Sequence, residues 1–125
     1  MGTRRQRIFP LLLLLIATVC AASGYDWHLA VPERARTRNN PLASDPQAAA
    51  AGAKLFARHC AQCHGDDATG RPGRPNLHSM RVRASTPGEL EWLLTNGSLR
   101  NGMPSWSRLP EPQRWQLVTY LKSLQ

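Results

Sequence analysis

The chain has 125 residues and a formal net charge of +8 at pH 7. Three arginines, Arg4, Arg5 and Arg7, belong to an N-terminal segment with the character of an export signal, and the rest carries 13 basic and 8 acidic side chains, or +5. No nucleic acid partner is expected despite this positive charge, because the chain is expected to leave the cytosol and has no motif that reads bases.

An export signal is expected over residues 1–24. The basic start is followed by an almost wholly apolar run from Ile8 to Val19, and small residues come next. This order is that of a signal peptide. The apolar run is shorter than the roughly 18 residues that suggest a spanning helix, which disfavours an uncleaved membrane anchor.

Cys20, at the end of the apolar run, has two interpretations. It resembles the lipidated cysteine of a bacterial lipobox, although Ala17 and Val19 differ from the residues usual at their positions. Lipidation adds two or more acyl chains, which suffices for stable anchoring to a membrane. Alternatively, a signal peptidase cuts after one of residues 21–24 and removes Cys20. The sequence leaves both interpretations open.

Residues 25–43 are expected to form an extended tether. The segment holds two prolines and alternating arginines, and it shows neither a helical nor a strand period. About 20 extended residues reach at most about 65 Å, which would let an anchored domain swing towards its partners. Tyr25, Trp27 and Leu29 interrupt this polar segment, and they either dock on the domain or lie at a membrane interface.

Residues 44–125 are expected to form one small domain whose first helix begins near Ser44 or Asp45. Either residue can cap the helix, and Pro46 suits its first turn. Gly52 and Phe56, four residues apart, share one helix face. Glycine inside a helix costs roughly 1 kcal/mol against alanine, so Gly52 is interpreted as a point where a second helix approaches closely.

The sequence Cys60-Ala61-Gln62-Cys63-His64 follows this helix. It is the attachment signature of a c-type haem. Residues i and i+3 share a helix face, so Cys60 and Cys63 can form thioethers with the two vinyl groups of one haem. His64 is then the proximal ligand of the iron, and its other ring nitrogen needs an acceptor. We therefore expect one covalently bound haem c.

Three other interpretations of the cysteine pair are weaker. A thioredoxin-like pair belongs to a βαβ setting, and no stretch of this sequence resembles a strand. A zinc site needs four ligands, and the one further cysteine is Cys20 in the export signal. A disulfide between Cys60 and Cys63 would close too short a loop to contribute much stability.

Residues 65–83 are expected to form a loop that wraps one side of the haem, because they are rich in glycine and proline and show no periodicity. Pro75 is the candidate that offers its carbonyl oxygen to the Nδ1 proton of His64, and Leu77 is a candidate for covering the ring. Four arginines of this loop can pair with the haem propionates, although a solvated surface position is the simpler expectation for each of them: Arg71, Arg74, Arg81 and Arg83.

A second helix is expected to begin at Thr86. Thr86 and Glu89 can form a capping box, leucines recur at helical spacing, and Asn96-Gly97 ends the helix. Trp92 on this helix is a candidate for packing on the haem, with a core or half-exposed position as the alternative.

The loop Asn101-Gly102-Met103-Pro104 is expected to supply the sixth ligand of the iron. Glycine and proline bracket Met103, and a thioether ligand favours ferrous iron and raises the reduction potential. Met80 is the rival, followed by His59, His78 and an open position. Met80 is interpreted as a packing residue, and His59 is too near the attachment site to reach the opposite face.

The last helix is expected from about Glu111 to Leu124. Leu117, Tyr120 and Leu121 form an apolar stripe on it, which we expect to pack on the first helix around Gly52. The expected fold is therefore all-α, with three to four helices around the haem. The haem supplies the core that a domain this short lacks.

Several features in this order resemble class I monohaem cytochromes c: Gly52, Phe56, Cys60–His64, Pro75–Leu77, residues 101–104 and Tyr120. The resemblance covers about residues 44–125. It implies crossed N- and C-terminal helices, a haem crevice with one exposed edge, and transfer of single electrons. The arginine-rich loop and the prolines that crowd the start of the last helix depart from the family pattern, which leaves the docking surface and the exact helix start open.

The function expected from the motif and the resemblance is that of a periplasmic electron-transfer protein, not itself an enzyme, that carries one electron between respiratory or dehydrogenase partners. A basic face around the haem would steer the protein towards an acidic docking face. Two alternatives stay open. One is a haem-based ligand sensor or peroxidase with a labile sixth ligand, and the other is a cytochrome fixed as a subunit of an oxidase or dehydrogenase complex.

Overall fold

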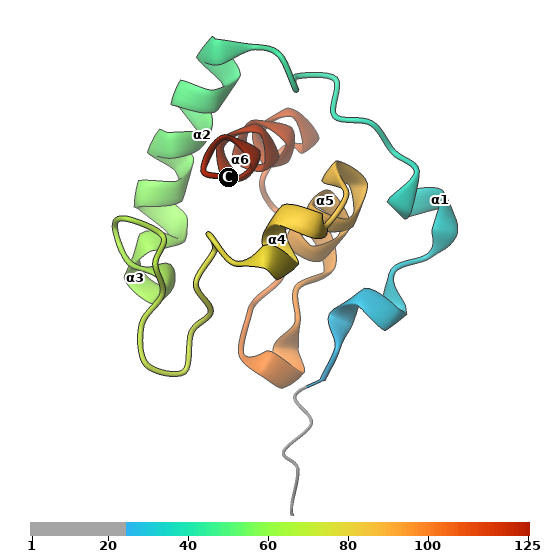
Figure 1. Ribbon diagram of the computed structural model, residues 1–125. Coiled ribbons are helices and arrows are strands. Elements are labelled where there is room, and N and C mark those ends of the chain that lie inside the picture. The colour runs from blue at the N-terminus through green and yellow to red at the C-terminus, as the bar shows by residue number, and fades with distance from the viewer. Residues whose placement is uncertain (1–24) are drawn as a thin grey trace, which may run out of the picture.

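The computed structural model describes residues 25–125 (Figure 1). The expected export signal and Cys20 lie outside the described residues. In chain order the elements are the 3₁₀ helix η1 (Trp27–Ala30), α1 (Glu33–Arg36), α2 (Pro46–His59), α3 (Ala61–His64), α4 (Met80–Ala84), α5 (Pro87–Asn96), the 3₁₀ helix η2 (Leu99–Asn101) and α6 (Glu111–Ser123). This part of the chain has helices and no strand, which confirms the all-α prediction. None of its helices is both long and apolar enough to cross a membrane.

Helices α2 and α6 cross in direct contact at Gly52. Figure 1 shows α2 running in the plane of the view and α6 nearly end-on beside it. A Cβ atom at Gly52 would lie 2.1 Å from the carbonyl oxygen of Gln116 and 2.8 Å from the Cβ of Tyr120. Phe56 packs on the same face, with its ring centroid 5.3 Å from that of Tyr120. The close helix approach at Gly52 and the crossing of the terminal helices are therefore confirmed.

Side-chain caps set the starts of three helices. Asp45 caps α2 by accepting a hydrogen bond from the Gln47 N–H at 2.8 Å. Thr86 and Glu89 form the expected capping box at the start of α5. Ser79 caps α4, which lies inside the segment that the sequence assigned to one loop. That loop is therefore shorter than predicted, and the cap at Ser79 was the local signal for the helix.

The core is small and lies between α2, α5 and α6. Phe56, Leu117 and Val118 are its most completely buried large side chains. Leu90 and Leu94 of α5 join them in one apolar cluster. These three helices form the frame that carries the residues of the candidate site.

Residues 25–43, here called the N-terminal segment, do not form the expected extended tether. They include η1 and α1, and they run along the domain on the side that carries α5 (Figure 1). The amide of Asn40 donates hydrogen bonds to the Trp115 carbonyl oxygen at 3.3 Å and to the Thr119 hydroxyl at 2.9 Å. Val31 and Ala35 of the segment are buried as well, but these isolated apolar contacts form no amphipathic stripe, which is why the sequence shows no periodicity here.

Candidate haem site

A cavity of about 740 Å³ opens between the helices and the two loops that follow α3 and α5. Its inner wall is apolar and comes from Phe56 of α2, Leu90 and Leu94 of α5, and Leu117 and Leu121 of α6. Pockets that hold cofactors and small molecules are usually about 300–1,000 Å³ and mostly apolar. The cavity therefore has the size and the lining for a large apolar cofactor.

Both cysteines of the attachment motif line this cavity. Cys60 lies at the end of α2, and Cys63 lies one turn later in α3. Both are free thiols. Burial, with the neighbouring Cys63 as a second cause, raises the pKa of the Cys60 thiol to about 11. The end of α2 and the short helix α3 thus present two sulfur atoms to the same cavity.

His64 closes the motif and lies on the same wall. Its Nδ1 atom is 3.3 Å from the carbonyl oxygen of Pro75, the partner that the sequence predicts. Burial lowers the pKa of His64, with Arg74 as a smaller cause in the same direction, and the Pro75 carbonyl partly offsets them. A neutral imidazole that donates its Nδ1 proton to Pro75 has Nε2 left as a ligand atom.

The loop after α3 holds Pro75 and Leu77 against the cavity. The Gly70 N–H donates to the His64 carbonyl oxygen at 2.8 Å, and the Leu77 N–H donates to the Ala68 carbonyl oxygen at 2.9 Å. Pro75 and Leu77 both line the cavity. Backbone hydrogen bonds therefore place both candidate residues on the same side as His64.

Met103 lines the same cavity from the loop after α5. Ser98 and Met103 exchange backbone hydrogen bonds, with the Ser98 N–H at 2.8 Å from the Met103 carbonyl oxygen and the Met103 N–H at 3.0 Å from that of Ser98. Gly97 precedes the loop with φ of 71° and ψ of −173°. This closed turn fixes the position of the Met103 backbone.

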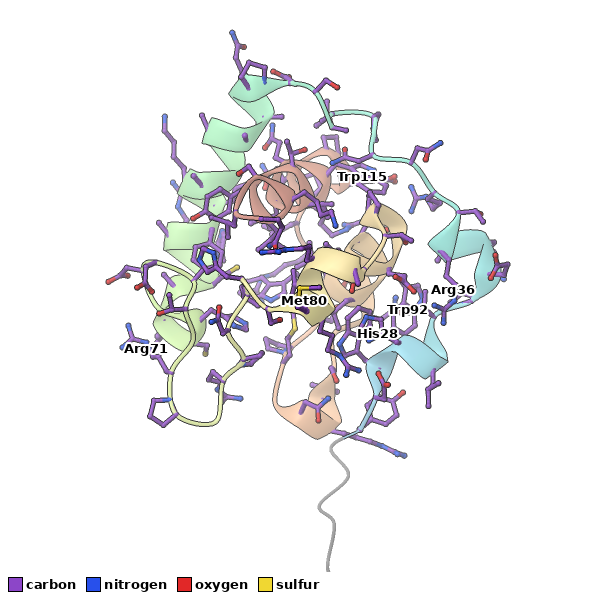
Figure 2. The ribbon with its side chains drawn as sticks, in the orientation of Figure 1. His28, Arg36, Arg71, Met80, Trp92 and Trp115 are labelled. Atoms are coloured by element: carbon purple, nitrogen blue, oxygen red, sulfur yellow. The ribbon has the colours of Figure 1, made fainter. Side chains whose placement is uncertain are left out.

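The rival ligands differ in their placement. Met80 is 70% exposed on α4 and is not among the residues that line the cavity (Figure 2). The two ring nitrogens of His78 lie 3.1 Å and 2.9 Å from the carbonyl oxygens of Leu124 and Asp67. His59 does line the cavity, with its ring centroid 5.3 Å from that of Trp106. Of the two candidate methionines, Met80 and Met103, it is Met103 that is placed to meet a cofactor in this cavity.

Trp92 is not among the residues that line this cavity and is half-buried, which favours the half-exposed position that the sequence left open. It lines a separate groove of about 270 Å³ together with Pro32 and Arg34 of the N-terminal segment. Figure 2 shows Trp92 on the side of the molecule that carries this segment. The spacing of apolar residues on α5 could not settle which face the indole occupies, because Leu90 and Leu94 already fill the face towards the cavity.

Two tryptophans that the sequence left without a cofactor role line the cavity instead, Trp27 of η1 and Trp106 after the Met103 loop. Trp106 directly follows Pro104-Ser105, so its place next to the candidate ligand was the available signal. For Trp27 the signal was an aromatic side chain in an otherwise polar segment.

The residues present fit a c-type haem. The cavity combines two thiols, an imidazole with one nitrogen already hydrogen-bonded, and a thioether, within walls that are otherwise mainly apolar. Imidazole and thioether are the axial ligand pair of many electron-transfer cytochromes. The attachment group, both candidate axial ligands and the apolar walls belong to one cavity.

A solved structure supports the fold. The crystal structure of cytochrome CL from the marine methylotrophic bacterium Methylophaga aminisulfidivorans superimposes with a TM-score of 0.58 and 23% sequence identity, over 66% of this chain and 57% of that chain. At this identity the likeness concerns the fold, which is that of a cytochrome c.

Sequence comparison identifies the family. The model of the family described as cytochrome c oxidase, cbb3-type, subunit III matches residues 47–121. The oxidase subunit CcoP of Rubrivivax gelatinosus is 36% identical over 106 residues, which is 70% of this chain and 35% of that protein. Subunit FixP of Bradyrhizobium sp. (strain ORS 278) is 42% identical over 81 residues, or 61% and 27%. The chain thus spans about a third of the length of these relatives. Since the family match covers more than half of the sequence, the chain belongs to the c-type cytochromes of the cbb3-type oxidase subunit III family.

Proposed function

We propose that this protein carries single electrons on one covalently attached haem c. The observation that carries the proposal is the shared cavity, in which Cys60, Cys63 and His64 face the same space as Met103. A bound haem c supplies one-electron cycling between ferric and ferrous iron. Electron transfer needs no bound substrate, so in this proposal the chain acts as a carrier and is not itself an enzyme.

Each residue has a distinct role in this proposal. Cys60 and Cys63 would hold the cofactor through thioethers, and His64, oriented by its hydrogen bond to Pro75, would supply an imidazole nitrogen to the iron. Met103, held by the turn between Ser98 and Met103, would supply a thioether sulfur. The apolar walls exclude water, which stabilises the less charged ferrous state.

Basic residues around the cavity support an acidic docking face on the partner. Arg74 lines the cavity, and the guanidinium carbon of Arg100 lies 5.0 Å from the ring centroid of Tyr25, which also lines it, whereas the charge of Arg81 is paired with Asp26. A positive rim accelerates encounters with an acidic surface. Electron transfer to such a partner should therefore slow as salt rises from low to physiological ionic strength.

The relatives favour a second version of this function. Those proteins are subunits of cbb3-type cytochrome c oxidase, so this chain is either a free carrier or a fixed subunit of such a complex. Co-purification from the native membrane distinguishes the two, because a fixed subunit stays with the complex through detergent extraction and a free carrier does not.

We further propose that the chain is exported and works in the periplasm, where haem c is attached in related cytochromes. The intact mass of the mature protein decides between a lipid tether at Cys20 and a cleaved signal. A mass that corresponds to a chain beginning at residue 22 or later rules the tether out.

The decisive test of the electron-transfer proposal is whether the sixth coordination position of the haem iron is closed to added ligands. Protein from a host with haem-attachment machinery should keep its haem on denaturation, and carbon monoxide should leave the reduced spectrum unchanged. Rapid carbon monoxide binding to the wild type would refute a closed site and favour a ligand sensor or peroxidase. Met103→Ala should abolish the sulfur-to-iron charge-transfer band and lower the reduction potential. Met80→Ala, a control at an exposed methionine, should change neither.

A further inference from the structure

The N-terminal segment supplies residues to the haem cavity although it lies outside the family match. That match begins at residue 47, whereas Tyr25, Asp26 and Trp27 line the cavity together with the attachment motif and Met103. In Figure 1 this start of the segment lies on the opposite side of the domain from α3. A part of the cavity wall is thus built by residues that precede the domain shared with the family.

The segment is fitted to the start of α5. Arg36 forms an ion pair with Glu89, whose side chain is only 8% exposed, and its guanidinium also donates to the carbonyl oxygen of His28. The backbone packs just as closely, because a Cβ atom at Gly88 would lie 1.9 Å from the carbonyl oxygen of Ala35. No side chain larger than hydrogen fits at Gly88 unless the segment moves away.

A second set of contacts fixes η1 on the end of α4. The Ser85 hydroxyl donates to the Arg81 carbonyl oxygen at 2.9 Å, and His28 Nε2 lies 2.8 Å from the same hydroxyl oxygen. Since that hydroxyl proton is already used, the imidazole Nε2–H is the donor to Ser85. His28 Nδ1 lies 3.0 Å from the Arg81 guanidinium and 3.2 Å from the Asp26 carboxylate, and Arg81 pairs with Asp26, the cap of η1. Asp26, His28 and Ser85 therefore anchor η1 on the end of α4.

These anchors orient Trp27. Its indole stacks on the His28 imidazole with ring centroids 3.6 Å apart and an interplanar angle of 25°. The indole is half-buried and packs against the apolar core cluster, whereas the neighbouring Leu29 is 84% exposed. Trp27 is therefore the apolar side chain of η1 that lines the cavity, and its ring stack with His28 holds it there.

We propose that Trp27 is a haem-packing residue, positioned by the anchored N-terminal segment, that shields the cofactor of this cavity from water. The proposal rests on the haem-binding function proposed above. It assigns to residues 25–43 the role of a cavity wall, in place of the tether that their composition predicted.

The expected consequence follows from solvation. An indole against the cavity excludes water from it, and a drier surrounding disfavours the more highly charged ferric state. Removal of the indole should therefore lower the reduction potential and admit small ligands more readily. A purely structural role of Trp27 would lower stability and leave the potential of the folded protein unchanged.

The test uses the full chain with haem attached and compares Trp27→Ala with the matched control Trp92→Ala. Both variants lose an indole near the N-terminal segment, but Trp92 lines the separate groove and not the cavity. Redox titration and carbon monoxide binding to the reduced protein are measured beside thermal unfolding. Trp27→Phe, which keeps an aromatic ring, and Ser85→Ala, which removes the acceptor for His28, complete the set.

We expect a lower potential and detectable carbon monoxide binding, absent in the wild type, in Trp27→Ala, a smaller shift in the same direction in Ser85→Ala, and wild-type behaviour in Trp92→Ala and Trp27→Phe. Unchanged values in Trp27→Ala, or an equal shift in Trp92→Ala, would overturn the proposal. If Trp27→Ala does not fold, a wild-type potential in Ser85→Ala overturns it. Wild-type protein without haem would overturn the proposed function itself, whereas wild type with haem and no response to these variants overturns only the role of Trp27.

Discussion

Gly97→Ala offers a sharp test of how the Met103 loop is held. Gly97 has a φ of 71° and a ψ of −173°, a region that is essentially reserved for glycine and costs other residues about 1–3 kcal/mol. An alanine Cβ would also lie 2.6 Å from the backbone nitrogen of Ser105 and 2.8 Å from the carbonyl oxygen of Met103. An ordinary contact needs at least 3.4 Å, so the loop must move by about 0.8 Å.

The expected result is a loss on two independent readouts. Strain alone lowers the midpoint of thermal unfolding by roughly 4–8 °C per kcal/mol in a domain of this size. The displaced loop should, in addition, weaken the sulfur-to-iron charge-transfer band and lower the reduction potential.

Gly73→Ala is the matched control for this variant. Gly73 has a φ of 74°, but a Cβ atom there meets nothing within 4 Å. This variant should therefore lose stability through backbone strain and keep the charge-transfer band. If Gly97→Ala keeps the band and the potential of the wild type, the Gly97 turn does not position the ligand and the reasoning is refuted.

Three further predictions concern stability. Gly52→Ala should lose about 1–3 kcal/mol of stability in denaturant titrations, because the added methyl group overpacks the contact with α6. The control Ala50→Gly, at an exposed position, should lose only about 1 kcal/mol through its lower helix propensity. A Gly52→Ala variant more stable than the wild type would contradict the tight helix crossing. Arg36→Gln leaves the buried carboxylate of Glu89 without its cation and should cost about 1–3 kcal/mol, since Arg36 is itself 32% exposed; unchanged unfolding would show that the pair does not hold the N-terminal segment. Hydrogen bonds from Trp115 and then Arg38 lower the pKa of Glu111, so its stabilisation is present above the ordinary carboxyl pKa of about 4.3 and is lost as the pH falls through the lowered value. Glu111→Gln should thus be less stable than the wild type at pH 7, with a difference that disappears in acid, and a constant difference across this pH range would argue against the assignment.

The sequence by itself determined the parts of the molecule that depend on short-range patterns. The all-α fold follows from helical spacing and caps such as Thr86 with Glu89, and the cofactor class follows from Cys60, Cys63 and His64, because two thioether sites and an adjacent imidazole need no long-range information to be recognised. The close approach at Gly52 was also predictable, since a glycine inside a helix is costly without a neighbour that requires it.

The tertiary structure alone decided which aromatic side chains reach the cavity. Trp92 was a reasonable candidate by its spacing on α5, yet it faces a different groove, and Trp27 enters the cavity from a segment without any period. The direction of each indole depends on contacts between residues far apart in the chain, such as Arg36 with Glu89 and His28 with Ser85. Periodicity describes one element at a time, so it predicts the helices, whereas pairing across more than 50 residues appears only when the chain has folded.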